Sequence, residues 1–235
     1  MVNKLEMLKI LFNMQNDANT LTNGDCWVEG FNENGLEINW CRCMRFELVE
    51  AIDQSFSWKH WKNIKNNNQY DYMQNGLHNV KIELVDVFHF LMSENIKQSW
   101  TSEMIALFDK FDLSNTKIFT QIELIQEIEN LERIVFNYED DNTFQNMKIL
   151  YNTFWKVVLS VMTFNEVYEM YILKNTLNIF RQNNGYKDGS YIKEWGIDKL
   201  EDNLFLETYI NDGGIIDYNS ITNYLDKKYQ ELNNI

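Results

Sequence analysis

Proline is absent from the 235-residue sequence, and glycine occurs only nine times. Because proline breaks helices and both residues mark turns, their scarcity favours long helices and disfavours an all-β chain, which needs many turns. Long apolar runs are missing too, since residues 1–17 alternate charged and polar positions with apolar ones. No signal peptide or membrane-spanning segment is expected. These absences predict an all-α, soluble, cytoplasmic protein without a membrane partner.

Basic residues and cysteines are also few. The chain has 21 Lys and Arg against 35 Asp and Glu, which gives a formal net charge of -14. Nucleic acid would be repelled on average, so it is not expected as a partner, and any anionic ligand requires local cations. The three cysteines, Cys26, Cys41 and Cys43, form no Cys-x-x-Cys pair, which argues against a disulfide framework or a closed zinc site.

Apolar periodicity predicts the helices. The 45% hydrophobic content can fill a sizeable core. Helical spacing is expected over residues 3–19, 40–55, 78–94, 101–111, 117–137, 144–163, 165–182 and 219–233, with loops at 20–39 and 66–76. We expect a single helical domain, a bundle with a four-helix catalytic core from about 1–95 and 144–195. A helical insertion at about 96–143 would form an additional lobe, and 196–235 a C-terminal helical extension.

Two pairs of carboxylates stand three residues apart on expected helices. Glu47 and Glu50 lie on the helix from Trp40, and Glu83 and Asp86 lie on the next one among apolar residues. Residues at this spacing project from the same side of a helix, and buried carboxylates need a compensating cation. Oxygen-only ligands favour magnesium over zinc. Taken alone, a solvated face or a set of salt bridges explains the pairs equally well.

A second metal interpretation involves Asp86 and His89, whose D-x-x-H spacing occurs in di-iron carboxylate bundles. Such a bundle needs two motifs of this type, and neither His60 nor His78 has a carboxylate three residues before it. We therefore disfavour a di-iron centre and expect His89 to be a hydrogen-bonded core residue.

A cationic stripe follows near residue 174. Lys174, Asn178 and Arg181 lie at i, i+4 and i+7 of an expected helix, which leads into a loop with Tyr186 and Lys187. In an acidic chain this stripe favours a phosphate site. The alternative is a basic helix C-terminus that balances its own dipole.

Four segments, 46–50, 57–62, 82–86 and 174–186, resemble the motifs of dimeric dUTPases, which belong to the all-α nucleotide pyrophosphatases. The resemblance covers about 5–95 and 150–195, in the family's order, and no motif matches in 96–150. It implies a homodimeric hydrolase of nucleotide metabolism, a dUTP diphosphatase. Such an enzyme cleaves dUTP to dUMP and pyrophosphate with two or more magnesium ions per site, and could also accept dUDP.

The resemblance also implies roles for individual residues. Metal ligands would be Glu47, Glu50, Glu83 and Asp86, with Glu50 beside Glu47 as the catalytic residue that orients the attacking water. Phosphate contacts would come from Lys174, Arg181, Lys187 and Lys59. Nucleoside contacts would come from Gln15, Asn19, Trp61, Asn178 and Tyr186. The family has an asparagine close behind the first-helix glutamine, and either Asn16 or Asn19 fits that position.

Two other functions remain open from the sequence. An all-α pyrophosphatase could act on another nucleotide such as dCTP. Alternatively, the fold could serve as a regulatory module that binds a protein partner through the unmatched middle lobe. The enzyme and the module differ in whether substitution of Glu83 or Asp86 abolishes magnesium-dependent pyrophosphate release.

Overall fold

The computed structural model describes residues 3–55, 76–111 and 117–233. Its helices are α1 (Lys4–Asn23), α2 (Trp40–Gln54), α4 (Leu77–Lys97), α5 (Thr101–Asp109), α6 (Gln121–Asp140), α7 (Phe144–Val158), α8 (Phe164–Asn183), α9 (Asp202–Asn211) and α10 (Tyr218–Asn233). A 3-10 turn, η1 (Trp27–Glu29), and a two-stranded antiparallel hairpin, β1 (Glu194–Trp195) and β2 (Leu200–Glu201), complete the described chain. The all-α prediction is confirmed.

Polar caps fix where the helices begin. The side chains of Asn3 and Asn39 accept hydrogen bonds from the free backbone N–H groups that open α1 and α2. A capping box, in which the side chain of the cap residue and a glutamate three positions later satisfy each other's backbone, opens α6 and α8. Thr163 and Glu166 form the one on α8, so the helix that carries the cationic stripe begins at a defined residue.

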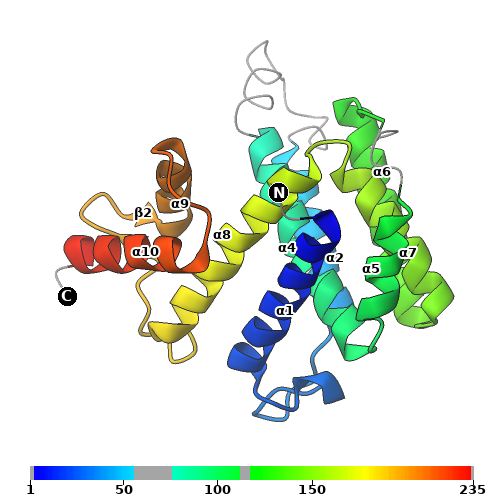
Figure 1. Cartoon of the computed structure of the whole chain (residues 1–235), viewed down its shortest axis with the longest axis horizontal. Helices are drawn as coiled ribbons and strands as arrows, with labels where there is room; N and C mark the ends of the chain where they lie inside the picture. Colours follow the sequence, from blue (N-terminus) through cyan, green and yellow to red (C-terminus); the bar gives the residue numbers. More distant parts are fainter. Residues whose placement is uncertain (1–2, 56–75, 112–116, 234–235) are drawn as a thin grey trace.

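Helices α1, α2, α4 and α8 form the centre of the molecule. In Figure 1, α5, α6 and α7 lie to one side of them, and α9 and α10 lie to the other side, against α8. Helices α2 and α4 have the most extensive packing of any pair. The centre is filled by fully buried apolar residues from all four helices, among them Leu8, Leu11, Met44, Leu48, Leu84, Phe88 and Leu177. Because the apolar faces of α2, α4 and α8 are buried in this way, only their polar faces are available to form a site.

Several elements differ from their expected extents, among them α6, which was expected over 117–137 and spans Gln121–Asp140. Helix α1 continues past residue 19 to Asn23, although it buries no residue beyond Asn19, and Gly24, at φ 91°, ends it. The expected helix over 144–163 ends at Val158, before Thr163 caps the next one. The hairpin was not expected, and the expected helical extension over 196–235 gave no separate bounds for α9. Among the described residues, no helix is long and apolar enough to cross a membrane.

Candidate active site

Three carboxylates converge between α2 and α4. Glu47 comes from α2, Glu83 and Asp86 come from α4, and one oxygen of each lies within 4.8 Å of the others. The close packing of the two helices through their apolar faces brings the carboxylate-bearing edges together. All three residues are partly buried. An oxygen-only set of this kind matches the ligands that magnesium prefers.

The electrostatics of this cluster fit a cation. Burial raises the pKa of Glu47 to about 8, with further increases from the negative charges of Asp86, Glu83 and Glu50. Burial also raises the pKa of Glu83 to about 7, followed by the charge of Asp86. With these raised pKa values, Glu47 is largely protonated and Glu83 about half protonated at pH 7, although the Lys174 ammonium lowers both pKa values. A divalent ion would remove that repulsion, so the donor set is suited to one.

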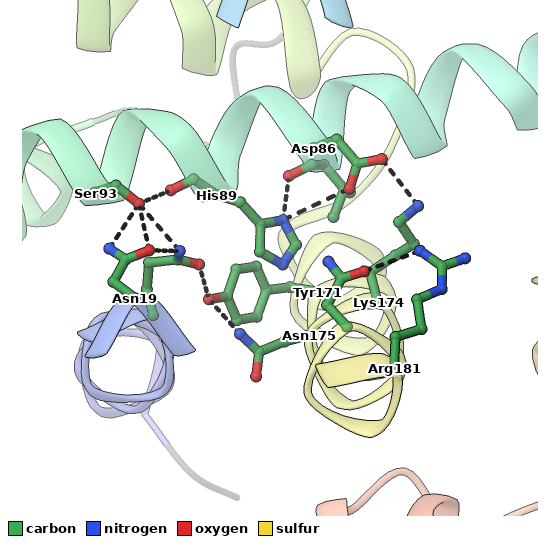
Figure 2. A network of polar contacts seen from close by, with 11 residues as sticks. Asn19, Asp86, His89, Ser93, Tyr171, Lys174, Asn175 and Arg181 are labelled. Atoms are coloured by element: carbon green, nitrogen blue, oxygen red, sulfur yellow. Dashed lines mark hydrogen bonds and ion pairs between the residues drawn. The ribbon is translucent and has the colours of Figure 1, made fainter. Parts of the chain in front are cut away.

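Glu50 and Lys174 lie at the edges of this cluster. Glu50 is exposed and is not among the three residues whose oxygens converge, although its charge reaches both Glu47 and Glu83. Lys174 of α8 places its Nζ 2.9 Å from Asp86 Oδ2, with both side chains largely buried. The stripe on α8 therefore faces the carboxylates of α4, as Figure 2 shows.

A polar cavity of about 240 Å³ adjoins the cluster. It lies between α1, α2, α4 and α8, and its lining includes Asp86. Four of the residues predicted to contact the nucleoside also line it: Gln15, Asn19, Asn178 and Tyr186. Arg181, which was predicted to contact phosphate, lines the same cavity. Residues more than 160 positions apart in the sequence thus share one cavity.

The floor of the cavity is a buried hydrogen-bond network. Gln15 Nε2 donates to Asn19 Oδ1 at 2.9 Å and to Ser93 Oγ at 3.0 Å. Asn19 Nδ2 donates to the same hydroxyl at 2.9 Å, and Tyr171 donates to Gln15 Oε1 at 2.6 Å. Figure 2 shows Asn19, Ser93 and Tyr171 within this network. It occupies both Nε2 hydrogens of Gln15 but only one Nδ2 hydrogen of Asn19, so Asn19 retains a donor for a ligand.

Several polar atoms of the lining residues have no partner among the described residues. They are Trp40 Nε1, His89 Nε2, Asn175 Oδ1 and Gln182 Oε1. Buried polar groups are normally hydrogen-bonded, and a group of unpaired ones around one cavity suggests a polar ligand. The sequence arguments missed Trp40, Phe90, Asn175 and Gln182. For Phe90, Asn175 and Gln182 the available signal was their position on the same helix faces as Asp86 and Asn178, whereas Trp40, on α2, carried no such signal.

His89 has a defined protonation state at this cavity. Its Nδ1 lies 2.8 Å from the Val85 carbonyl, and its ring stacks on Tyr171 with centroids 4.1 Å apart. Burial lowers the pKa of His89 to about 4, so the ring is neutral at pH 7. Because a carbonyl can only accept, Nδ1 carries the proton and Nε2 is an acceptor. His89 is hydrogen-bonded in the core, as expected, and it also lines the cavity.

Two of the predicted phosphate ligands are paired with carboxylates elsewhere. Arg181 binds Asp202 of α9 through two nitrogens. Lys187 lies in the loop after α8, and its Nζ is 2.8 Å from Glu33 Oε1 on the surface. Lys59 and Trp61 lie outside the described residues.

The model of the family described as dUTPase matches residues 7–186. This chain belongs to the dUTPase family. The match includes the carboxylates of α2 and α4 and the whole stripe on α8, and it stops before α9 and α10. No match is found among curated proteins.

The raised pKa values predict how the stability of this dUTPase-family chain depends on pH. Glu47 and Glu83 bind protons in the folded state up to about pH 8 and 7, whereas ordinary glutamates lose them near 4.5. Over this window the folded state holds more protons, so stability decreases as pH rises. We expect the free energy of unfolding in EDTA to fall by several kcal/mol between pH 5 and 8.5, since each extra proton held in the folded state contributes about 1.4 kcal/mol per pH unit. Urea denaturation measures it.

A matched pair of variants separates this effect from the general repulsion of an acidic chain. Glu47→Gln with Glu83→Gln should flatten the pH profile, while Glu103→Gln, an exposed position on α5, should keep the slope of the unchanged protein. Equal slopes in all three proteins would contradict the assignment of the raised pKa values to this cluster.

Proposed function

We propose that the protein is a dUTP diphosphatase that hydrolyses dUTP to dUMP and pyrophosphate with magnesium. The observation that carries the proposal is the position of Asp86, which belongs to the carboxylate cluster and also lines the polar cavity. A nucleotide with its base in the cavity would have its phosphates beside the carboxylates. Membership of the dUTPase family supports this substrate.

The carboxylates would hold the metal and manage the proton of water. Glu47, Glu83 and Asp86 are the ligands that the geometry favours, and Glu50 extends the set so that two or more ions could be held. Bound magnesium supplies charge neutralisation of the phosphates and a more acidic water. Glu50 is open to solvent one turn from Glu47, where a carboxylate can accept a proton from an attacking water.

The cations of α8 would receive the phosphates. Lys174 is at hydrogen-bonding distance from Asp86, and its ammonium can turn to a phosphate oxygen once metal ions neutralise that carboxylate. Arg181 lines the cavity two turns further along the same face of the helix. Lys187 would join them by releasing Glu33, a surface partner whose attraction is weak in water.

The cavity offers complementary groups for a uracil edge. Uracil presents an N3–H donor between two carbonyl acceptors. His89 Nε2 would accept from N3–H, while Asn19 Nδ2 and Trp40 Nε1 would donate to the carbonyls. Cytosine carries a lone pair at N3, which would face the lone pair of His89. The same base and sugar contacts are available to dUDP.

Self-association is part of the proposal. Phe46 and Val49, which flank Glu47 on α2, are 64% and 51% exposed. Large apolar side chains beside a charged site are typical of a surface covered in the assembled protein. We propose a homodimer, and a monomeric mass in sedimentation equilibrium would contradict it.

The substrate assignment is tested with the purified chain and a panel of nucleotides. We expect pyrophosphate release in magnesium to be fastest with dUTP, slower with dCTP and dTTP, and absent in excess EDTA. Binding of dCTP would leave polar groups of the cavity unpaired, and dTTP would add a methyl group to the cavity. If dCTP or dTTP reacted as fast as dUTP, the base assignment would fail while the reaction class survived. Full activity in EDTA would contradict the metal site.

A further inference from the structure

A buried ion pair joins α8 to α9. Arg181 Nε donates to Asp202 Oδ2 at 2.8 Å, and Nη2 donates to Oδ1 at 2.7 Å. The side chain of Asp202 is fully buried, and that of Arg181 is 13% exposed. Two parallel hydrogen bonds of this type fix both the place and the plane of a guanidinium. Because both charges are buried, removing one partner would leave an uncompensated buried charge, which is costly.

The position of Asp202 is itself fixed by the C-terminal lobe, residues 191–233. Its Oδ2 also accepts from the Tyr191 hydroxyl at 2.9 Å, and its backbone N–H donates to the Lys193 carbonyl. The lobe is anchored to α8 by aromatic contacts, with Phe180 packed against Trp195 and Tyr229. The carboxylate is therefore held by the hairpin, the start of α9 and the aromatic cluster together.

The other side of the Arg181 guanidinium meets the cavity. Its Nη1 donates to Asn178 Oδ1 at 3.1 Å, and both residues line the cavity wall. Figure 2 shows Arg181 on the same side of α8 as Lys174, which reaches Asp86. An unrestrained arginine has many rotamers, and ordering it on binding costs affinity. Here the ordering is complete before any ligand arrives.

We propose that Asp202 is a positioning residue that holds Arg181 in place for the phosphates of the substrate. The C-terminal lobe, all of which lies beyond the matched residues 7–186, would then complete the active site. This inference rests on the proposed function, because it takes Arg181 to bind phosphate. Asp202 itself would not touch the substrate, since its oxygens are already engaged by Arg181 and Tyr191.

The test compares Asp202→Asn with Asp226→Asn, an exposed carboxylate of α10 in the same lobe. Kinetics with dUTP are combined with calorimetric binding of inorganic tripolyphosphate in magnesium, a probe without base or sugar. We expect Asp202→Asn to raise the KM for dUTP and the Kd for tripolyphosphate at least about 10-fold and to lower kcat less, because displaced binding groups are costly. Asp226→Asn should match the unchanged protein.

A double-variant cycle shows whether Asp202 acts through Arg181. Arg181→Gln and Arg181→Gln with Asp202→Asn should have the same KM and the same Kd for tripolyphosphate. A further loss in the double variant, or unchanged constants in Asp202→Asn, would overturn the inference. Should Asp202→Asn alone fail to fold, the neutral pair still gives this comparison. Tyr191→Phe removes only one hydrogen bond to Asp202. It should then raise the KM slightly and lower the melting temperature less than Asp202→Asn does.

Failure of this inference can be told from failure of the proposed function. If the unchanged protein does not hydrolyse dUTP but Asp202→Asn still weakens tripolyphosphate binding, the substrate is wrong and the positioning role stands. If dUTP is hydrolysed and Asp202→Asn has normal KM and Kd, the function stands and the positioning role is wrong. An unchanged protein that binds no tripolyphosphate would also overturn the positioning role.

Discussion

Replacing Glu83 by glutamine is expected to lower the kcat for pyrophosphate release on the order of 1,000-fold. Glutamine keeps the shape of the side chain but removes the charge that helps to retain a divalent ion between α2 and α4. Bound metal supplies several kcal/mol of transition-state stabilisation, and about 4 kcal/mol corresponds to that loss. The carboxylate of Glu83 converges with those of Glu47 and Asp86, the other two members of the cluster. Initial rates over a range of magnesium concentrations measure the effect.

The same variant should not lose stability. Burial and the charge of Asp86 raise the pKa of Glu83, so its ionised form is unfavourable in the metal-free protein. In EDTA at pH 8, Glu83→Gln should therefore be at least as stable to urea as the unchanged protein, which separates lost chemistry from misfolding. Glu103→Gln serves as the matched control and should change neither quantity. Magnesium-dependent activity of Glu83→Gln within about 10-fold of the unchanged rate would contradict the metal site.

The helical part of the fold could be predicted because the pattern of apolar residues is strong. The described helices α2, α4 and α8 agree with the expected ranges within about three residues at each end. The hairpin and α9 could not be predicted in the same way. Strands of two residues have no measurable alternation, and α9 buries few side chains, among them Asp202 and Leu206. From the sequence alone, a fully buried aspartate such as Asp202 cannot be distinguished from a surface residue.

The candidate site was predictable where spacing along one helix defines a face. The i, i+3 pairing of Glu83 and Asp86 and the i, i+4, i+7 stripe on α8 both predicted groups that the structure places at one site. Pairings between helices carried no such signal. The ion pair between Arg181 and Asp202 joins residues that are 21 positions apart across a hairpin. Likewise, nothing in the sequence indicates that Trp40 and Asn175 face the same cavity.

Replacing His89 by phenylalanine is expected to reduce the preference for dUTP over dCTP by about 10- to 100-fold in kcat/KM. Phenylalanine keeps a ring that can stack on Tyr171, but it has no acceptor for the uracil N3–H. A buried donor left without its partner costs about 1 to 3 kcal/mol, which corresponds to this range. For dCTP, the variant also removes the opposing lone pair, so its kcat/KM should fall less or rise. Competition between the two nucleotides in one reaction measures the ratio directly.

The effect on dUTP alone would not identify the cause, because a damaged cavity would slow both nucleotides. The ratio is informative because the neutral imidazole of His89 is fixed as an acceptor at Nε2 by the Val85 carbonyl at Nδ1. The amide of Gln182 can turn to present either a donor or an acceptor, so it cannot distinguish the two bases as strictly. Asn175 already offers an acceptor, because its Nδ2 donates to the Tyr171 hydroxyl at 3.1 Å and its Oδ1 has no partner among the described residues. Asn175→Asp, which keeps an acceptor at that position, should therefore preserve the preference for uracil. If His89→Phe left the preference for dUTP over dCTP unchanged and Asn175→Asp abolished it, base recognition would be assigned to α8 and not to α4.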